Sequence, residues 1–141
     1  MALTELMKAL KQLSLAETGF LPKAGKQTRK AVFLVEMDTV EPWSCLEALI
    51  EPFYPKKGNC RTPMQLGTML SIRFMQQWFG YSDPAMEEAL HDIPLLRQFA
   101  GLDASEDVMP DESTILGFRH LLEQHDLAAA IFAEVAGVLS E

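Results

Sequence analysis

Apolar residues recur at helical spacing along almost the whole chain, and this pattern limits the fold more than any other feature of the sequence. In the stretch from 63 to 79, Leu66, Met69, Leu70 and Phe74 fall three or four positions apart, on one face of a helix. Isoleucine and valine are scattered one or two to a segment and never alternate with polar residues as they do in strands. The sequence therefore predicts an all-α fold, a compact bundle of about six to eight short helices.

Proline, glycine and capping residues divide this pattern into segments. The strongest start signal is Thr62, Pro63 and Gln65, which fit a helix cap, the first helical position and the capping-box partner. Gly80 and Gly101 are expected to end the helices that precede them. The helices expected from these signals cover residues 1–15, 26–40, 43–50, 63–79, 83–92, 94–100, 112–122 and 127–139.

Two of the expected helices resemble a helix-turn-helix in outline. Residues 64–79 and 83–92 are joined by a short turn, Gly80 to Ser82, and such a turn is a common way to present a DNA-reading helix. The segment 83–92, however, has four acidic residues and no lysine or arginine. We therefore regard it as a poor candidate for a helix that lies in a major groove.

The length and the apolar content fit one globular domain with a core. We expect residues 1–22 to form an N-terminal helical extension and residues 23–141 to form the helical domain. No apolar stretch approaches the roughly 20 residues of a membrane span, and the start lacks the order of a signal peptide. Cys45 and Cys60 have no metal-site or disulfide spacing and are expected to be reduced. These features predict a cytoplasmic protein without membrane contact.

The charge of the chain is unevenly distributed, although its formal sum of -8 is acidic. Residues 1–31 hold six basic and two acidic side chains, a net charge of +4. Residues 32–62 hold three basic and five acidic side chains, and residues 63–141 hold three arginines and thirteen acids. The chain therefore runs from a basic beginning to an acidic end, and any nucleic-acid contact is expected near the beginning.

Two basic clusters are candidates to follow a phosphate backbone. The first cluster, which we call the basic N-terminal segment, consists of Lys23, Lys26, Arg29 and Lys30. It lies at the start of the expected helix 26–40, where the helix dipole also attracts an anion. The second cluster, which we call the basic loop, consists of Lys56, Lys57 and Arg61. It lies in the proline-rich connection that precedes the expected helix 63–79. The alternative for both is an ordinary solvated basic surface. The candidate DNA-binding residues are Lys23, Lys26, Arg29 and Lys30 of the segment, and Lys56, Lys57 and Arg61 of the loop.

The remaining conspicuous side chains have structural interpretations. Apolar neighbours flank Arg73, Arg97 and Arg119, so each is expected to form an internal ion pair, with an acid such as Asp92 or Asp111. The three histidines have no ligand spacing and no nucleophile nearby, and the sequence indicates no metal site, no cofactor and no catalytic residue. Five aromatic residues are placed in the core by their helical phase: Trp43, Phe74, Trp78, Phe79 and Phe118.

Three segments of the chain resemble the InsH-type N-terminal domain of the insertion-sequence-five group of transposases. They are KQTRKAVFLVEMDTVEPW at 26–43, YPKKGNCRTPMQLGTMLSIRFMQQWFGYSDPAMEEALHDIP at 54–94, and RQFAGLDASEDVMPDESTILGFRHLLEQH at 97–125. The loop of form YPxxGxxRxP, the WFGYSD turn and the PDExTIxxFRxxLE helix are the most specific pieces. The resemblance implies a DNA transposase whose full-length relatives cut and rejoin insertion-sequence ends with three carboxylates and divalent metal, on an RNase H-like fold.

The resemblance also implies that the catalytic domain follows the matched region, so this chain is expected not to be an enzyme by itself. Asp83, Asp111 and Glu123 form no catalytic set in this interpretation, because helix capping explains the first two and a solvated helix face explains the third. Two functions stay open. In the first, the chain binds double-stranded DNA at transposon ends. In the second, it is an assembly or inhibitory module that pairs with itself or with full-length transposase.

Overall fold

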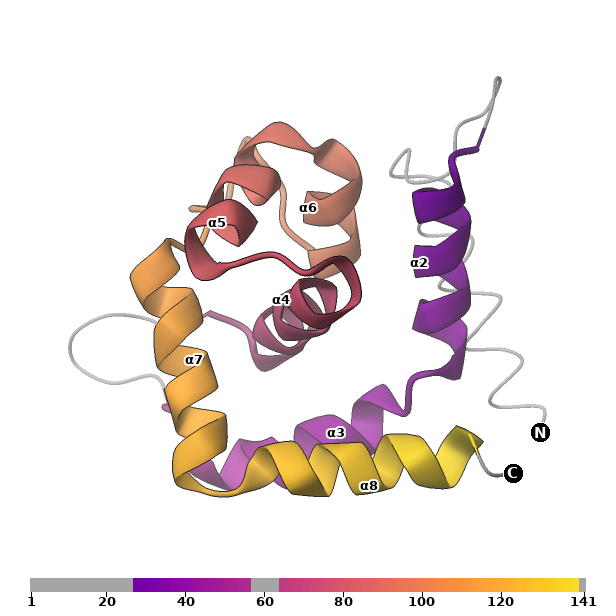
Figure 1. Cartoon of the computed structure of the whole chain (residues 1–141). Helices are drawn as coiled ribbons and strands as arrows, with labels where there is room; N and C mark the ends of the chain where they lie inside the picture. Colours follow the sequence, from indigo (N-terminus) through magenta and orange to yellow (C-terminus); the bar gives the residue numbers. More distant parts are fainter. Residues whose placement is uncertain (1–26, 57–63, 140–141) are drawn as a thin grey trace. The chain divides into compact units, whose positions relative to one another are not determined.

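The computed structural model describes residues 27–56 and 64–139, and within these ranges it contains seven α-helices and no strand (Figure 1). The predicted all-α fold is confirmed. The helix expected over residues 1–15 lies outside the described residues. None of the described helices has the length and apolar character that a bilayer crossing requires.

The helices follow one another with short connections. The first two are separated by Glu41 and Pro42, and a single 3-10 turn follows the second. In chain order the elements are α2 (Arg29–Val40), α3 (Trp43–Ile50), η1 (Glu51–Phe53), α4 (Leu66–Phe79), α5 (Asp83–Asp92), α6 (Pro94–Ala100), α7 (Glu112–Gln124) and α8 (Leu127–Leu139).

The chain forms two units, residues 1–41 and residues 42–141. The described helix of the first unit is α2, which buries Ala31, Leu34 and Asp38 along one face. The second unit holds α3 to α8. The domain boundary expected after residue 22 lies outside the described residues and stays a prediction.

Side-chain caps and left-handed glycines set the helix ends. The predicted ends at Gly80 and Gly101 are confirmed, whereas the helix expected from residue 26 begins at Arg29, because Thr28 caps it there. The side chains of Thr28, Ser82 and Asp111 accept hydrogen bonds from backbone N–H groups of α2, α5 and α7, at 3.1, 3.2 and 2.8 Å. Gly80 and Gly101 end α4 and α6 with φ of 72° and 77°, a conformation that disfavours any residue with a Cβ atom. Local sequence therefore fixes these boundaries.

The predicted start of α4 was wrong. The helix begins at Leu66, and Gln65 precedes it in an extended conformation without a side-chain capping bond, so Gln65 is not a capping-box residue in the first turn. The hydroxyl of Tyr54 donates a hydrogen bond to the carbonyl oxygen of Met64. A helix that began earlier would use the carbonyl oxygen of Met64 in its own backbone hydrogen bonds. Tyr54, ten residues away in the sequence, occupies this oxygen instead.

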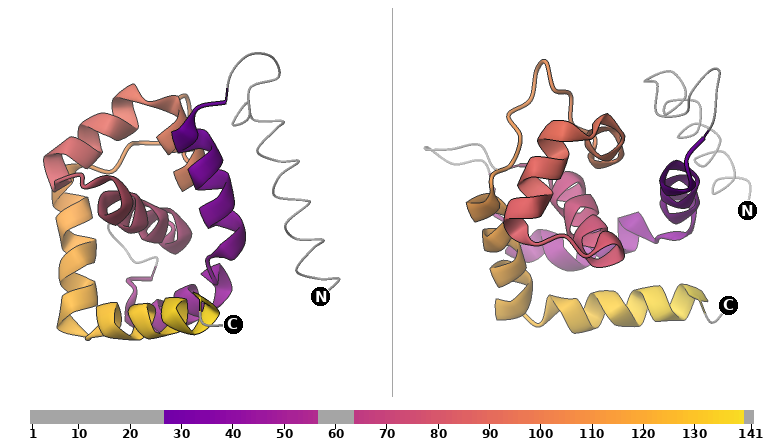
Figure 2. Two further views of the ribbon diagram at one scale, coloured as in Figure 1. Left: turned by 45° about the vertical axis from the view of Figure 1, so that its right-hand side comes forward. Right: turned by 45° about the horizontal axis from the view of Figure 1, so that its top comes forward.

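Helix α4 is the centre of the second unit. It contacts α3, α5, α6 and α7, which lie around it in Figures 1 and 2. It is buried on more than one face, and its hydroxyl at Thr68 donates to the carbonyl oxygen of Ala100 at 2.8 Å. Because α4 packs on all of these neighbours, it forms the core of the second unit.

Candidate functional site

The basic N-terminal segment is described at two of its four residues, Arg29 and Lys30. Lys23 and Lys26 lie outside the described residues. Arg29 is exposed and Lys30 is half-buried, and both stand in the first turn of α2, which holds no acidic residue. The cap at Thr28 fixes the direction in which this turn starts. The cationic side chains and the positive end of the helix dipole therefore occupy the same place, which suits an anion.

The exposed face of α2 limits any phosphate contact to its first turn. Arg29 is followed along that face by Val32, Glu36 and Val40, all exposed. The carboxylate of Glu36 would repel a phosphate two turns from the helix start. A DNA backbone that touches Arg29 is therefore expected to meet α2 end-on rather than along its length.

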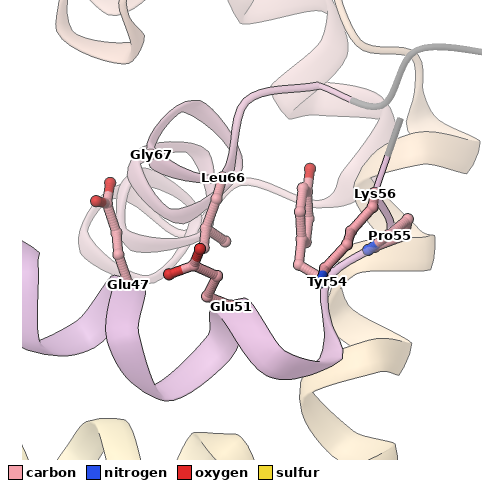
Figure 3. Close-up of a pocket in the computed structure, with 7 residues that line it drawn as sticks. All are labelled: Glu47, Glu51, Tyr54, Pro55, Lys56, Leu66 and Gly67. Carbon is pink, nitrogen blue, oxygen red and sulfur yellow. The ribbon is translucent and has the colours of Figure 1, made fainter. Parts of the chain in front are cut away.

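The basic loop is described only at Lys56, which is exposed. Lys57 and Arg61 lie outside the described residues. Lys56 lines an open pocket of about 400 Å³ together with residues of α3, the start of η1, the two residues that follow η1, and the start of α4 (Figure 3). Glu47 of α3 and Glu51 of η1 extend into this region, so the pocket combines two carboxylates with one ammonium group. Its net charge does not suit a phosphate, and Lys56 serves DNA only if it points away from the pocket.

Tyr54 anchors the chain on both sides of residues 57–63. Its hydroxyl binds the carbonyl oxygen of Met64, and its ring packs edge-on against Phe118 of α7 with 6.1 Å between the ring centres. Burial raises the pKa of Tyr54 to about 12, so the hydroxyl stays a hydrogen-bond donor at neutral pH. Sequence reasoning gave this residue no role, and the only signal for it was its position inside the YPxxGxxRxP motif.

A polar network joins α4, α5 and α7 beneath the turn between α4 and α5. Arg119 donates to Asp83 at 2.8 Å, and the buried amide of Gln76 donates to the same carboxylate oxygen at 2.9 Å. Arg73 donates to Gln76 at 3.5 Å. Burial opposes the charge of Asp83, but the hydrogen bonds from Gln76 and Arg119 and the two nearby guanidinium groups together lower its pKa. Burial and the neighbouring Arg119 lower the pKa of Arg73.

The expected internal ion pair is confirmed for Arg119 alone, and with a different acid from those named; Arg97 binds backbone carbonyl oxygens and Arg73 contacts a glutamine instead. Arg119 pairs with Asp83, not with Asp92 or Asp111. Arg97 binds the carbonyl oxygens of Leu90 and His91, at 2.9 and 2.7 Å, and so satisfies acceptors at the end of α5. The sequence could not reveal these partners because they depend on how α4 to α7 pack.

The three carboxylates considered as a catalytic set have separate contacts. The prediction that Asp83 caps a helix was wrong, because Ser82 is the cap of α5 and Asp83 stands one position after it, where it joins the network around Arg119. Asp111 caps α7, as predicted, and Glu123 is an exposed residue whose carboxylate lies 3.9 Å from Arg119. Within residues 27–56 and 64–139, no group of three or more histidine, cysteine or acidic side chains is arranged to hold a metal ion.

The predicted core position is confirmed for Phe74 and Phe118, which are buried, and only in part for Trp43, Trp78 and Phe79, which are half-buried. Trp43 of α3 lies edge-on to Phe74 and Phe99, and Trp78 stacks on Phe74 with 5.3 Å between ring centres. Phe118 is buried beside Tyr54. Phe79 is half-buried and contacts a tyrosine in the following turn. These contacts give the rings a packing role in place of base stacking.

Comparison with known families identifies the class of the chain. A family model described as Transposase domain (DUF772) matches residues 22–121. This span covers most of the chain, including both basic clusters and the network around Asp83, and it ends before α8. The chain therefore belongs to this transposase-domain family, which links it to transposition. No solved structure matches the chain.

Proposed function

We propose that this chain is the N-terminal DNA-binding and assembly domain of a bacterial insertion-sequence transposase of the InsH type, in the insertion-sequence-five group. It binds the double-stranded DNA of transposon ends in the cytoplasm. The basic N-terminal segment makes the first contact and the basic loop makes the second. The residues assigned to these contacts are Lys23, Lys26, Arg29, Lys30, Lys56, Lys57 and Arg61.

The observation that carries this proposal is the division of the cations between internal and exposed positions. Arg97 and Arg119 are held by carbonyl oxygens and by Asp83, and Arg73 contacts a buried glutamine. Arg29 and Lys56 are exposed. A DNA phosphate therefore meets Arg29 and Lys56 without breaking the core of the second unit, whereas recruiting the arginines of α4, α6 or α7 would break it.

In this proposal the chain binds DNA and does not cut it. The metal-dependent chemistry is assigned in this proposal to a separate catalytic domain. Asp83 and Asp111 serve helix starts and the network between helices, which are structural tasks that a metal ion would disturb. The measurable consequence is that the chain shifts DNA in a gel without nicking it, with or without magnesium.

A charge-reversal experiment tests the DNA contact. Lys26→Glu combined with Arg29→Glu is compared with Lys8→Glu combined with Lys11→Glu, which changes the net charge of the chain equally outside the assigned residues. Terminal-repeat DNA is titrated with each protein in a gel-shift assay. The first pair is expected to abolish the shift and the second to preserve most of it. An equal loss of DNA affinity in the two double variants would show that net charge alone weakens binding. That result would contradict the assigned contact.

A second candidate function is assembly, and an exposed helix face favours it. In α8 the side chain of Phe132 is 74% exposed, and Leu127 is the buried residue of this helix among residues 127–137. A domain that pairs with full-length transposase through this face would act as an inhibitor when expressed alone. Association of the chain through α8 without any shift of terminal-repeat DNA would favour assembly over DNA binding.

A further inference from the structure

The side chain of Arg73 on α4 is half-buried and forms no ion pair with any residue that the structure describes. Its hydrogen bond there is a long one, 3.5 Å, to the neutral side chain of Gln76. A guanidinium group has five N–H donors in a planar fork, so most of the donors of Arg73 stay unused by the protein. A charge that has lost part of its water is normally paired. Arg73 therefore has both the charge and the donors to hold an anionic ligand.

The other described arginines do not share this situation. Arg97 donates to two backbone carbonyl oxygens, at 2.9 and 2.7 Å, and Arg119 donates to Asp83 at 2.8 Å. Arg29 is exposed, so water surrounds its charge. Arg73 differs from all three, because it has neither a close acceptor among the described residues nor full exposure to water.

The guanidinium group of Arg119 makes the surroundings of Arg73 more positive. Burial and this neighbour lower the pKa of Arg73, and they outweigh the carboxylates of Asp83 and Glu123, which act to raise it. One oxygen of Asp83 is already used by Arg119 and Gln76. The side chain of Glu123 is 61% exposed and lies 3.9 Å from Arg119, which is a weak contact. The two guanidinium groups therefore share one closely bound carboxylate and are short of negative charge.

The position of Arg73 decides which anion fits. A carboxylate is planar and can accept two parallel hydrogen bonds from a guanidinium fork. It is small enough to reach the half-buried group in place, with the hydrogen bond to Gln76 kept. A DNA duplex is wide, so its phosphates would have to draw the arginine outward and would also come near the carboxylate of Glu123. A single carboxylate therefore suits this place better than DNA does.

We propose that Arg73, together with Arg119, binds the carboxylate side chain of an aspartate or glutamate on a protein partner. Glu123 is the loosely held competitor for these guanidinium groups, and an incoming carboxylate displaces it. This inference gives the assembly candidate a specific contact and rests on that candidate. It is independent of DNA binding by the two basic clusters.

Titration of the full chain with blocked tripeptides tests the proposal. One probe is alanine, glutamate and alanine with acetylated and amidated ends, so the glutamate side chain is its one carboxylate. The other probe has glutamine in place of glutamate. Binding is followed at constant ionic strength by the Nε–Hε NMR signals of Arg73 and Arg119. The glutamate peptide is expected to shift both signals to saturation and the glutamine peptide to leave them unchanged. Equal responses to the two peptides would overturn the proposal.

Substitutions at Arg73 and Glu123 are expected to change the affinity for the glutamate peptide in opposite directions. Arg73→Gln should abolish binding, read at the signal of Arg119, whereas Arg73→Lys keeps the charge without the fork and should retain part of it. Glu123→Gln removes the competing carboxylate and should tighten binding about threefold. Because Glu123 is exposed, this variant is expected to stay folded. Full binding by Arg73→Gln, or weaker binding by Glu123→Gln, would overturn the proposal.

DNA titration separates this contact from its alternative. Arg73→Gln is expected to bind terminal-repeat DNA as tightly as Lys8→Gln, which removes the same charge elsewhere in the chain. A larger loss in Arg73→Gln would assign the site to a DNA phosphate and overturn the proposal. Binding of the glutamate peptide by a chain that does not shift DNA would leave this inference standing while the proposed DNA contact fails, so the two failures are distinguishable.

Discussion

Arg119 and Asp83 join two helices that are distant in sequence, with 2.8 Å between Nη1 of the arginine and Oδ1 of the aspartate. Asp83 stands in the first turn of α5 and Arg119 in the middle of α7. The aspartate side chain is 13% exposed and that of the arginine 29%. Because both groups lose much of their contact with water, each depends on the other and on Gln76 for compensation.

Breaking this pair is expected to destabilise the second unit. Asp83→Ala and Arg119→Ala each leave a partly buried charge without its partner, which costs about 1–3 kcal/mol of unfolding free energy. The double variant is expected to lose less than the sum of the single losses, which urea unfolding in a double-mutant cycle would measure. Glu123→Ala, at the exposed and longer contact, serves as the control. Additive single losses would contradict a direct interaction between Asp83 and Arg119.

Asp83 also predicts a dependence of stability on acid pH. Its pKa is lowered in the folded protein, so the stabilisation is present above the ordinary value of 3.8 and is lost as the pH falls through the folded pKa. The difference in unfolding free energy between the unchanged chain and Asp83→Asn should therefore shrink as the pH falls from 5 toward 2. A difference that stays constant over this range would show that the carboxylate charge has no part in it.

Tyr54 predicts a loss of stability at alkaline pH. Burial raises its pKa from 10.0 to about 12, so between these values the unfolded chain releases a proton that the folded chain retains. Stability should therefore fall as the pH rises from 10 toward 12. Tyr54→Phe should fall less over this range, which thermal unfolding of both proteins would measure. An identical alkaline decline in both would exclude Tyr54 as its source.

Two glycines provide a matched test of backbone conformation. A Cβ atom added at Gly80 or at Gly117 meets no atom within 4 Å, so neither substitution causes a clash. Gly80 has a φ of 72°, and alanine there should cost about 1–2 kcal/mol from strain. Gly117 lies within α7, where alanine should stabilise the protein by about 0.5–1 kcal/mol. Denaturant midpoints of Gly80→Ala and Gly117→Ala should therefore shift in opposite directions, and shifts in the same direction would contradict the role of φ.

Helix type and most helix ends were predictable because they depend on neighbouring residues. Ser82 and Asp111 cap, and Gly80 and Gly101 terminate, through contacts within a few positions. The start of α4 was not predictable. The sequence signal at Thr62 and Pro63 favours an earlier start than the observed one at Leu66. The hydrogen bond from Tyr54 to Met64 opposes that earlier start, and it forms only where packing places Tyr54.

The candidate site was predictable from charge only in outline. Clusters of lysine and arginine are visible in the sequence, so Arg29 and Lys56 were named as candidate DNA contacts before their exposure was known. The partners of Arg97 and Arg119 were not found, because carbonyl oxygens and Asp83 reach them only after the helices pack. The exposed face of α8 was also missed, since its alanines fit a core helix equally well.

The salt dependence of affinity for terminal-repeat DNA tests the central claim most directly. Each phosphate contact contributes about 0.9 to the slope of log affinity against log salt concentration. The combined variant Lys26→Glu and Arg29→Glu should therefore bind weakly and with a slope smaller by about 2 than that of the unchanged chain. A slope and an affinity that stay the same in this variant would contradict DNA binding through the basic N-terminal segment.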